Sequence, residues 1–185
     1  MNFWYWRDNQ IYMAVNSDPH VHRFVVCANV FVRKDGKYLL LRRASAKKIA
    51  PNIVHPIGGK VDPGENPYTA AKREVLEEAG ITVKNMRLEA VIREGHPIPG
   101  PGKEEGWLVF YFSADYNSGE IRDTEEGDLL LFDADEISKH ILFPSVRLVL
   151  RHILNPKDGT VFLTASYDED GVLRQDSIIL DVCSV

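Results

Sequence analysis

The segment at residues 59–81 reads GKVDPGENPYTAAKREVLEEAGI, a glycine- and proline-rich stretch that runs into an acidic one. The first half predicts a tightly turned loop and the second half a short helix. Glu74, Glu77 and Glu78 stand at positions i, i+3 and i+4, so their side chains share one helical face. Three carboxylates this close repel one another unless a cation lies among them. The segment therefore predicts a site for a hard divalent ion, Mg²⁺ or Mn²⁺.

The same segment predicts where this helix begins, where it ends and which face it buries. Pro67 suits the first helical position, because the N–H group that it lacks would have no partner there. Gly80 suits the end. Glu65 in the loop is expected to pair with Arg73 and so fix the loop's shape. The small or apolar residues expected to face the core are Ala70, Ala71, Val75 and Ala79.

Written as a pattern, the segment is G-x5-E-x7-R-E-U-x-E-E-x-G-U, where U is aliphatic, and every specified position is filled. This pattern resembles the signature of the Nudix hydrolases. The resemblance implies an α/β (α+β) fold, an α/β/α sandwich with a mixed central sheet. It also implies a divalent-metal site on the helix and hydrolysis of a nucleoside diphosphate linked to another group. A helix that is acidic only for solubility is the alternative, but it explains neither the glycines nor the spacing.

The resemblance assigns roles to individual residues. The metal ligands that it implies are Glu74, Glu77, Glu78 and, through its carbonyl, Gly58. The supports of the loop and helix are Gly59, Glu65, Arg73 and Gly80. Of these residues, we count Glu77 and Arg73 as catalytic.

A general base is expected close to the metal, either within the helix or outside it. Glu125 and Glu126 precede the predicted strand at residues 128–132, the place where such an outside acid falls in the family. We favour Glu126 as the base. The alternative interpretation is that EEGD at residues 125–128 is only a solvated turn.

Basic side chains are needed to bind the phosphates. The motif LLLRRAS at residues 39–45 resembles the mutator-type branch of the family, in which the second arginine contacts substrate phosphate, here Arg43. Because strand side chains alternate, only one of Arg42 and Arg43 can face the site. Weaker candidates for phosphate binding are Lys47, Lys48 and Lys60.

The substrate is predicted less directly. The order of the elements and the last hairpin resemble the 8-oxo-dGTP diphosphatases, whose product is a nucleoside monophosphate plus pyrophosphate. By position, the residue that would contact the base is His55. Two departures weaken purine specificity: Pro56-Ile57-Gly58-Gly59 replaces Pro-Gly-Gly, and residues 143–146 lack the expected acidic or amide side chains.

Two other functions remain open. The proline-bearing loop at residues 96–100 lies where hydrolases of ADP-ribose and nucleotide sugars carry one, although it is also explained as a simple connector. A non-enzymatic nucleotide sensor with this fold is the third hypothesis. The complete set of carboxylates argues against a sensor, since a sensor does not need its metal ligands.

Composition sets limits on the class of protein. The chain has 185 residues, 26% charged and 44% hydrophobic, which is typical of one soluble domain. A net charge of −5 argues against duplex nucleic acid as a partner. No apolar run is long enough for a membrane span and no signal peptide is indicated. Two cysteines form no disulfide framework, so we expect a cytoplasmic protein.

We expect residues 1–20 to form an aromatic extension, with a hairpin across RDNQ, and residues 21–185 to form the Nudix domain. The extension's aromatic side chains should pack on the domain or on a second subunit, forming a homodimer, and one tryptophan could stack on a base. Predicted strands span residues 24–32, 37–42, 83–93, 107–112, 128–132, 161–166 and 172–180. A short helix should start at Asp133 and a longer one at Pro144 or Ser145.

Overall fold

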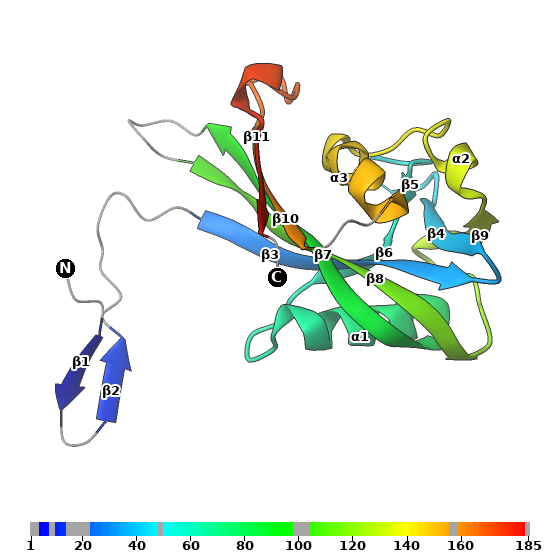
Figure 1. Cartoon of the computed structure of the whole chain (residues 1–185), viewed down its shortest axis with the longest axis horizontal. Coiled ribbons are helices and arrows are strands. Elements are labelled where there is room, and N and C mark those ends of the chain that lie inside the picture. Colours follow the sequence, from blue (N-terminus) through cyan, green and yellow to red (C-terminus); the bar gives the residue numbers. More distant parts are fainter. Residues whose placement is uncertain are drawn as a thin grey trace.

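A mixed β-sheet with helices on both faces forms the centre of the molecule (Figure 1). The computed structural model describes residues 4–7, 10–13, 23–47, 50–97, 104–155 and 159–183. Helix α1 (Pro67–Ala79) covers one face, and α2 (Ala134–Ile137) and α3 (Pro144–Leu154) cover the other. This arrangement confirms the predicted α/β/α sandwich.

The sheet in the described part of the chain has nine strands. Their order is β11 (Ile179–Cys183), β10 (Thr160–Ser166), β7 (Ile81–Pro97), β8 (Glu104–Gly119), β3 (Arg23–Lys34), β4 (Lys37–Arg43) and β5 (Val54–His55), with β6 (Ile57–Lys60) paired to β3 and β9 (Gly127–Phe132) paired to β4. The β3–β8 and β7–β10 pairs are parallel and the other pairs are antiparallel. The sheet is therefore mixed, as predicted.

Strand β3 has two different neighbours on one of its edges. Its carboxyl end, Val32–Lys34, pairs with β4, whereas its middle, Cys27–Val30, pairs with β6. Beyond Leu39, β4 leaves β3 and pairs with β5 instead, while β9 pairs with the other edge of β4 from Tyr38 to Arg43. The sheet thus forks between β4 and β6.

Two apolar clusters fill the layers on either side of the sheet. Strand β3 is buried without interruption from Ala28 to Val32, because both of its faces are covered. The cluster on the α1 side includes Val30, Leu39, Ile57, Ala70, Ala71, Val75 and Ala79. The cluster on the α3 side includes Phe31, Leu40, Ile92, Tyr111, Val146, Val149 and Ile153.

Local side-chain chemistry fixes both ends of α1. The Asn66 side chain accepts a hydrogen bond of 3.0 Å from the Thr69 N–H, and Pro67 occupies the first helical position. At the other end Gly80 has φ 69° and donates its N–H to the carbonyl of Leu76. The predicted limits and the predicted buried face of this helix are confirmed.

The last predicted strand is wrong in its limits. Residues 172–180 were expected to run as one strand, but a 3₁₀ turn occupies Gln175–Ser177 and β11 begins only at Ile179. The Ser177 hydroxyl donates to the Arg174 carbonyl at 2.6 Å and accepts from the Ser166 N–H at 2.8 Å. These bonds stabilise a turn where alternation of side chains had suggested a strand.

At the amino end, β1 (Trp4–Arg7) and β2 (Gln10–Met13) pair antiparallel in a separate two-stranded sheet. The side chains of this extension lie outside the described residues, so their packing and the homodimer stay predictions. No helix in the described ranges is long and apolar enough to cross a membrane.

Candidate active site

The acidic face of α1 lies against β6, the inner strand of the fork. Glu78 accepts a hydrogen bond of 3.1 Å from the Gly58 N–H. The Glu74 side chain, 13% exposed, lies so close to Gly59 that a Cβ built there would be 2.7 Å from its Oε1. Glu77 is 59% exposed. The three predicted ligands thus differ in exposure: Glu74 and Glu78 are half-buried, and Glu77 is exposed to solvent.

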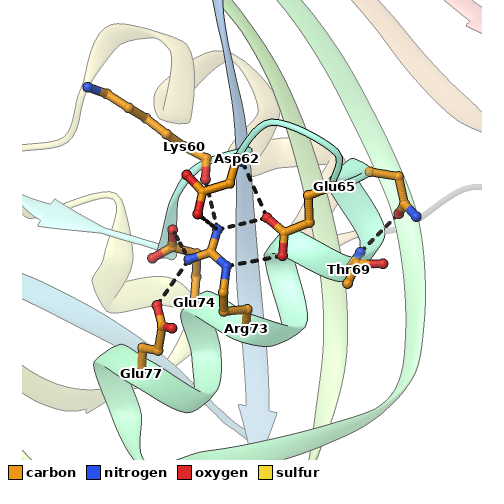
Figure 2. Close-up of polar contacts among 8 residues, drawn as sticks. Lys60, Asp62, Glu65, Thr69, Arg73, Glu74 and Glu77 are labelled. Carbon is orange, nitrogen blue, oxygen red and sulfur yellow. Dashed lines mark hydrogen bonds and ion pairs between the residues drawn. The ribbon is translucent and has the colours of Figure 1, made fainter.

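Arg73 connects the loop to the helix (Figure 2). Its Nε and Nη2 donate to the two carboxylate oxygens of Glu65 at 3.1 and 2.9 Å. Its Nη1 donates to Glu74 at 2.9 Å and to Glu77 at 3.0 Å, and its Nη2 also donates to the Lys60 carbonyl. These bonds, that to Glu65 foremost, raise the pKa of Arg73 further above its usual range. The structure therefore brings the predicted pair of Arg73 and Glu65 together.

Replacing Arg73 by lysine should lower kcat by roughly 10- to 100-fold. A single ammonium group cannot make all the hydrogen bonds of the guanidinium, so the loop would shift. The segment at residues 60–65 should also be cut faster by a protease in limited digestion. Lys72→Arg, on an exposed position of the same helix, is the matched control. Unchanged kcat and unchanged digestion would show that Arg73 does not support the loop.

The chemistry of the donors fits a hard divalent cation. Burial, together with the charges of Glu74 and Glu126, raises the pKa of Glu78 to about 7, although the Gly58 N–H opposes the rise. Burial also raises the pKa of Glu74, against its bond to Arg73. A nearby cation would stabilise both charged forms.

The geometry in the described part of the chain is less favourable to a metal. No group of three His, Cys, Asp or Glu side chains there is arranged to hold an ion together. In this arrangement Arg73 binds Glu74 and Glu77, while Glu78 faces the Gly58 N–H. The ligand set therefore stays a prediction, and it requires these side chains to turn from their present partners.

The two arginines at the end of β4 point in different directions. Arg42 donates to Asp128 at 2.6 Å on the exposed side of β9. The Nε of Arg43 is buried and has no hydrogen-bond partner among the described residues. The charge of Arg43 is close enough to act on both Glu78 and His55. An unsatisfied buried donor is costly, so this group is suited to bind an anion from outside the chain.

Glu126 lies on the opposite side of the same fork. Its carbonyl accepts a bond of 2.9 Å from the Ala44 N–H, and its carboxylate is 2.6 Å from the Lys47 ammonium. Its charge also acts on Glu78. Glu125 is exposed in the turn. Of the two acids considered for the base, Glu126 is therefore the one placed near the acidic face.

His55 lies at the inner end of the fork, edge-on to Phe143 with ring centroids 5.4 Å apart. Burial lowers the pKa of His55 to about 4, so the ring is neutral at pH 7. Its Nδ1 is 2.6 Å from the Pro56 carbonyl and must carry the proton, which leaves Nε2 as an acceptor. A neutral acceptor suits contact with a base better than contact with a phosphate.

The predicted lysines are less well placed. The side chain of Lys60 extends away from the carboxylates in Figure 2 and is exposed. Lys47 is paired to Glu126, and Lys48 lies outside the described residues. Residues 98–100 of the proline-bearing loop also lie outside them.

One buried polar residue of this region was missed by the sequence analysis. Asn29 is 4% exposed and pairs with Gly58 across β3 and β6. A Cβ on Gly58 would lie 2.6 Å from its Oδ1. In the sequence, Asn29 is a single amide within the apolar run FVVCANVFV, and this run by itself predicts an ordinary core strand.

Comparison with known proteins identifies the family. The model of the NUDIX domain matches residues 21–163, so the chain belongs to this family, the Nudix hydrolases. The recognition made from the sequence is confirmed. The MutT protein of Bacillus halodurans superposes with a TM-score of 0.70 at 29% identity, over 85% of this chain and 98% of that one. A MutT NUDIX hydrolase of Burkholderia pseudomallei gives 0.55 at 26% identity, over 71% and 98%.

Two relatives by sequence are named NAD-capped RNA hydrolase NudC. The protein of Salmonella typhi is 35% identical over 105 residues, which are 56% of this chain and 36% of the relative. That of Chromobacterium violaceum is 35% identical over 100 residues, 54% of this chain and 33% of the relative. The matched part spans about a third of the length of these relatives.

Proposed function

We propose that the chain hydrolyses a nucleoside diphosphate linked to another group, with Mg²⁺ or Mn²⁺ as cofactor. The observation that carries this proposal is the set of side chains that surround the fork. There the half-buried carboxylates of Glu74 and Glu78, the buried and unpartnered Nε of Arg43 and the carboxylate of Glu126 lie near one another. Clustered acids beside an arginine with an unsatisfied N–H donor suit a cation and the phosphates that it accompanies.

Each side chain of the fork has a role in this proposal. Glu74, Glu77, Glu78 and the Gly58 carbonyl would hold the metal ions, which neutralise phosphate charge and acidify water. Arg43 binds a phosphate oxygen through its guanidinium, whose buried Nε has no other partner among the described residues. Glu126 takes the proton of the attacking water. His55 accepts a hydrogen bond from the base through Nε2.

The substrate is proposed in two forms. The first is 8-oxo-dGTP or a related nucleoside triphosphate, released as monophosphate and pyrophosphate, which the MutT-type structural neighbours support. The second is a dinucleotide-like diphosphate such as NAD, ADP-ribose or a nucleotide sugar, which the relatives named as NAD-capped RNA hydrolases support. A sensor without activity remains the third proposal.

Product analysis separates these proposals. The chain is incubated with Mg²⁺ and, in turn, 8-oxo-dGTP, the dNTPs, NAD, ADP-ribose and UDP-glucose. Pyrophosphate with a monophosphate supports the first form, and two monophosphates from a dinucleotide or from ADP-ribose support the second. Tight binding without turnover supports the sensor. If EDTA leaves turnover unchanged, the proposed cofactor is wrong.

Replacing Arg43 by glutamine should raise KM by about 10-fold or more, because a charge-assisted bond to phosphate is lost. Arg42→Gln is the matched control, since it removes the same charge one residue earlier on the exposed side. Steady-state kinetics of both variants give the comparison. Equal effects of the two substitutions would mean that Arg43 does not bind the phosphate.

We also propose that residues 21–185 form the catalytic domain and residues 1–20 an extension that makes a homodimer. The protein would act in the cytoplasm on small nucleotides, without duplex nucleic acid or membrane as partners. Sedimentation of the full chain over a range of concentrations tests the dimer.

A further inference from the structure

Two turns meet beside Arg43, one after β4 and one before β9. These strands run side by side, with Arg43 at the end of β4 directly opposite Gly127 at the start of β9 (Figure 1). Beyond this pair the turns stay joined, because the Ala44 N–H donates to the Glu126 carbonyl at 2.9 Å. The proposed base therefore lies beside the residue proposed to bind phosphate.

Hydrogen bonds within the turn before β9 fix the backbone of Glu126. The Gly127 N–H donates to the Thr124 carbonyl at 3.1 Å, and the Glu126 N–H donates to the Thr124 hydroxyl at 3.3 Å. The Asp123 carboxylate accepts a bond of 2.8 Å from the Leu129 N–H. Side-chain oxygens that bind nearby N–H groups in this way hold a turn in one conformation. Only the side chain of Glu126 is left to be oriented.

The turn after β4 supplies the cation that orients this side chain. The Lys47 N–H donates to the Ala44 carbonyl at 3.1 Å, and the Lys47 ammonium lies 2.6 Å from Oε1 of Glu126. Lys47 and Glu126 are thus connected twice, through the backbone of Ala44 and through their own side chains. The two side chains are 28% and 39% exposed, so water shields the ion pair only in part.

The charges around Glu126 explain why a cation is needed there. The Glu126 carboxylate is close enough to Glu78 for its charge to contribute to the raised pKa of that group. Two carboxylates repel, so Glu126 would turn away from the acidic face of α1 unless a cation opposed the repulsion. Lys47 contacts only Oε1, which leaves Oε2 for a water molecule.

We propose that Lys47 is a positioning residue for the reaction, which holds the Glu126 carboxylate where it can take the proton of the attacking water. This inference rests on the proposed function, in which Glu126 is the base. Lys47 acts through Glu126 and does not itself contact the substrate. Its loss should therefore slow turnover and leave substrate binding unchanged.

Steady-state kinetics of Lys47→Met, which keeps a long unbranched side chain without the charge, test the proposal. We expect kcat to fall ~10-fold and KM to stay within about twofold. Lys47→Arg should keep kcat within about threefold of the parent, because a guanidinium can also pair with Oε1. Lys37→Met is the matched control, since Lys37 pairs with Asp133 at 2.8 Å at the other end of β4, and it should leave kcat unchanged.

The same substitution in a Glu126→Gln background shows whether Lys47 acts through Glu126. There Lys47→Met should change kcat by no more than about twofold, because the group that Lys47 positions has already been removed. A full ~10-fold loss in this background would mean that Lys47 acts on another group. That result, an unchanged kcat in Lys47→Met alone, or a raised KM with kcat unchanged overturns the proposal.

Amide hydrogen exchange of Ala44, measured by NMR without substrate, separates this proposal from the proposed function. The Ala44 N–H should exchange about threefold faster in Lys47→Met than in the parent, and at the parent's rate in Lys47→Arg. If Ala44 responds in this way but the parent hydrolyses no nucleotide, the proposed function alone is rejected. Unchanged exchange in Lys47→Met overturns the positioning by Lys47, whatever the activity.

Discussion

Replacing Glu77 by glutamine should lower kcat/KM by ~10³-fold or more, because one charged ligand of the proposed metal site is removed. The fold should be unaffected. Glu77 is 59% exposed, and its contact in the structure is an i, i+4 ion pair with Arg73 at 3.0 Å. An exposed pair of this kind contributes at most about 0.5 kcal/mol to stability. A large loss of activity with an unchanged melting temperature therefore separates catalysis from folding.

The measurement is kcat/KM over a range of Mg²⁺ concentrations, with the melting temperature of each variant. Glu136→Gln, an equal change of charge on the exposed side of α2, serves as the control and should leave kcat/KM unchanged. A Glu77→Gln variant that keeps activity within about threefold of the parent would remove Glu77 from the metal site.

Features that depend on nearby residues were predictable from the sequence. The start, the end and the buried face of α1 follow from Pro67, Gly80 and the small residues between them, because these effects act within a turn or two of helix. The pair of Glu65 and Arg73 was also expected, since the loop that joins them is short. The strands of alternating or continuous apolar residues were found for the same reason.

Features that depend on distant contacts were not predictable. The fork requires β6 to pair with β3, yet Gly58 and Gly59 give no strand signal, since glycine is depleted from strands. The pairing exists because the two glycines of β6 leave room for their neighbours: Gly58 lies against the backbone of β3 and Gly59 against Glu74. Likewise, spacing placed three acids on one face but did not reveal that Arg73 binds two of them. Asn29 is polar in a core strand, and neither its pairing with Gly58 nor its side-chain contact with Tyr111 can be read from the sequence.

Replacing Gly58 by alanine should destabilise the protein by ~3 kcal/mol or more, with a fall in melting temperature of about 6–12 °C. A Cβ there would lie 2.2 Å from the Ala28 carbonyl oxygen and 2.7 Å from the Cα of Asn29, both of which are backbone. Gly58 also has φ 152°, which disfavours a side chain. Because β6 is held in register with β3, the clash cannot be relieved without breaking that pairing.

Gly64→Ala is the matched control, because Gly64 also has positive φ, 86°, but a Cβ there meets nothing within 4 Å. It should cost only ~1 kcal/mol, or about 2–4 °C, from backbone strain alone. Thermal and urea unfolding of both variants therefore separate the steric cost from the conformational one. If Gly58→Ala melts within 2 °C or so of Gly64→Ala, β6 does not lie as tightly against β3 as described. The N–H group that Gly58 donates to Glu78 would then not be held in place by the sheet, and other contacts would have to position the Glu78 carboxylate.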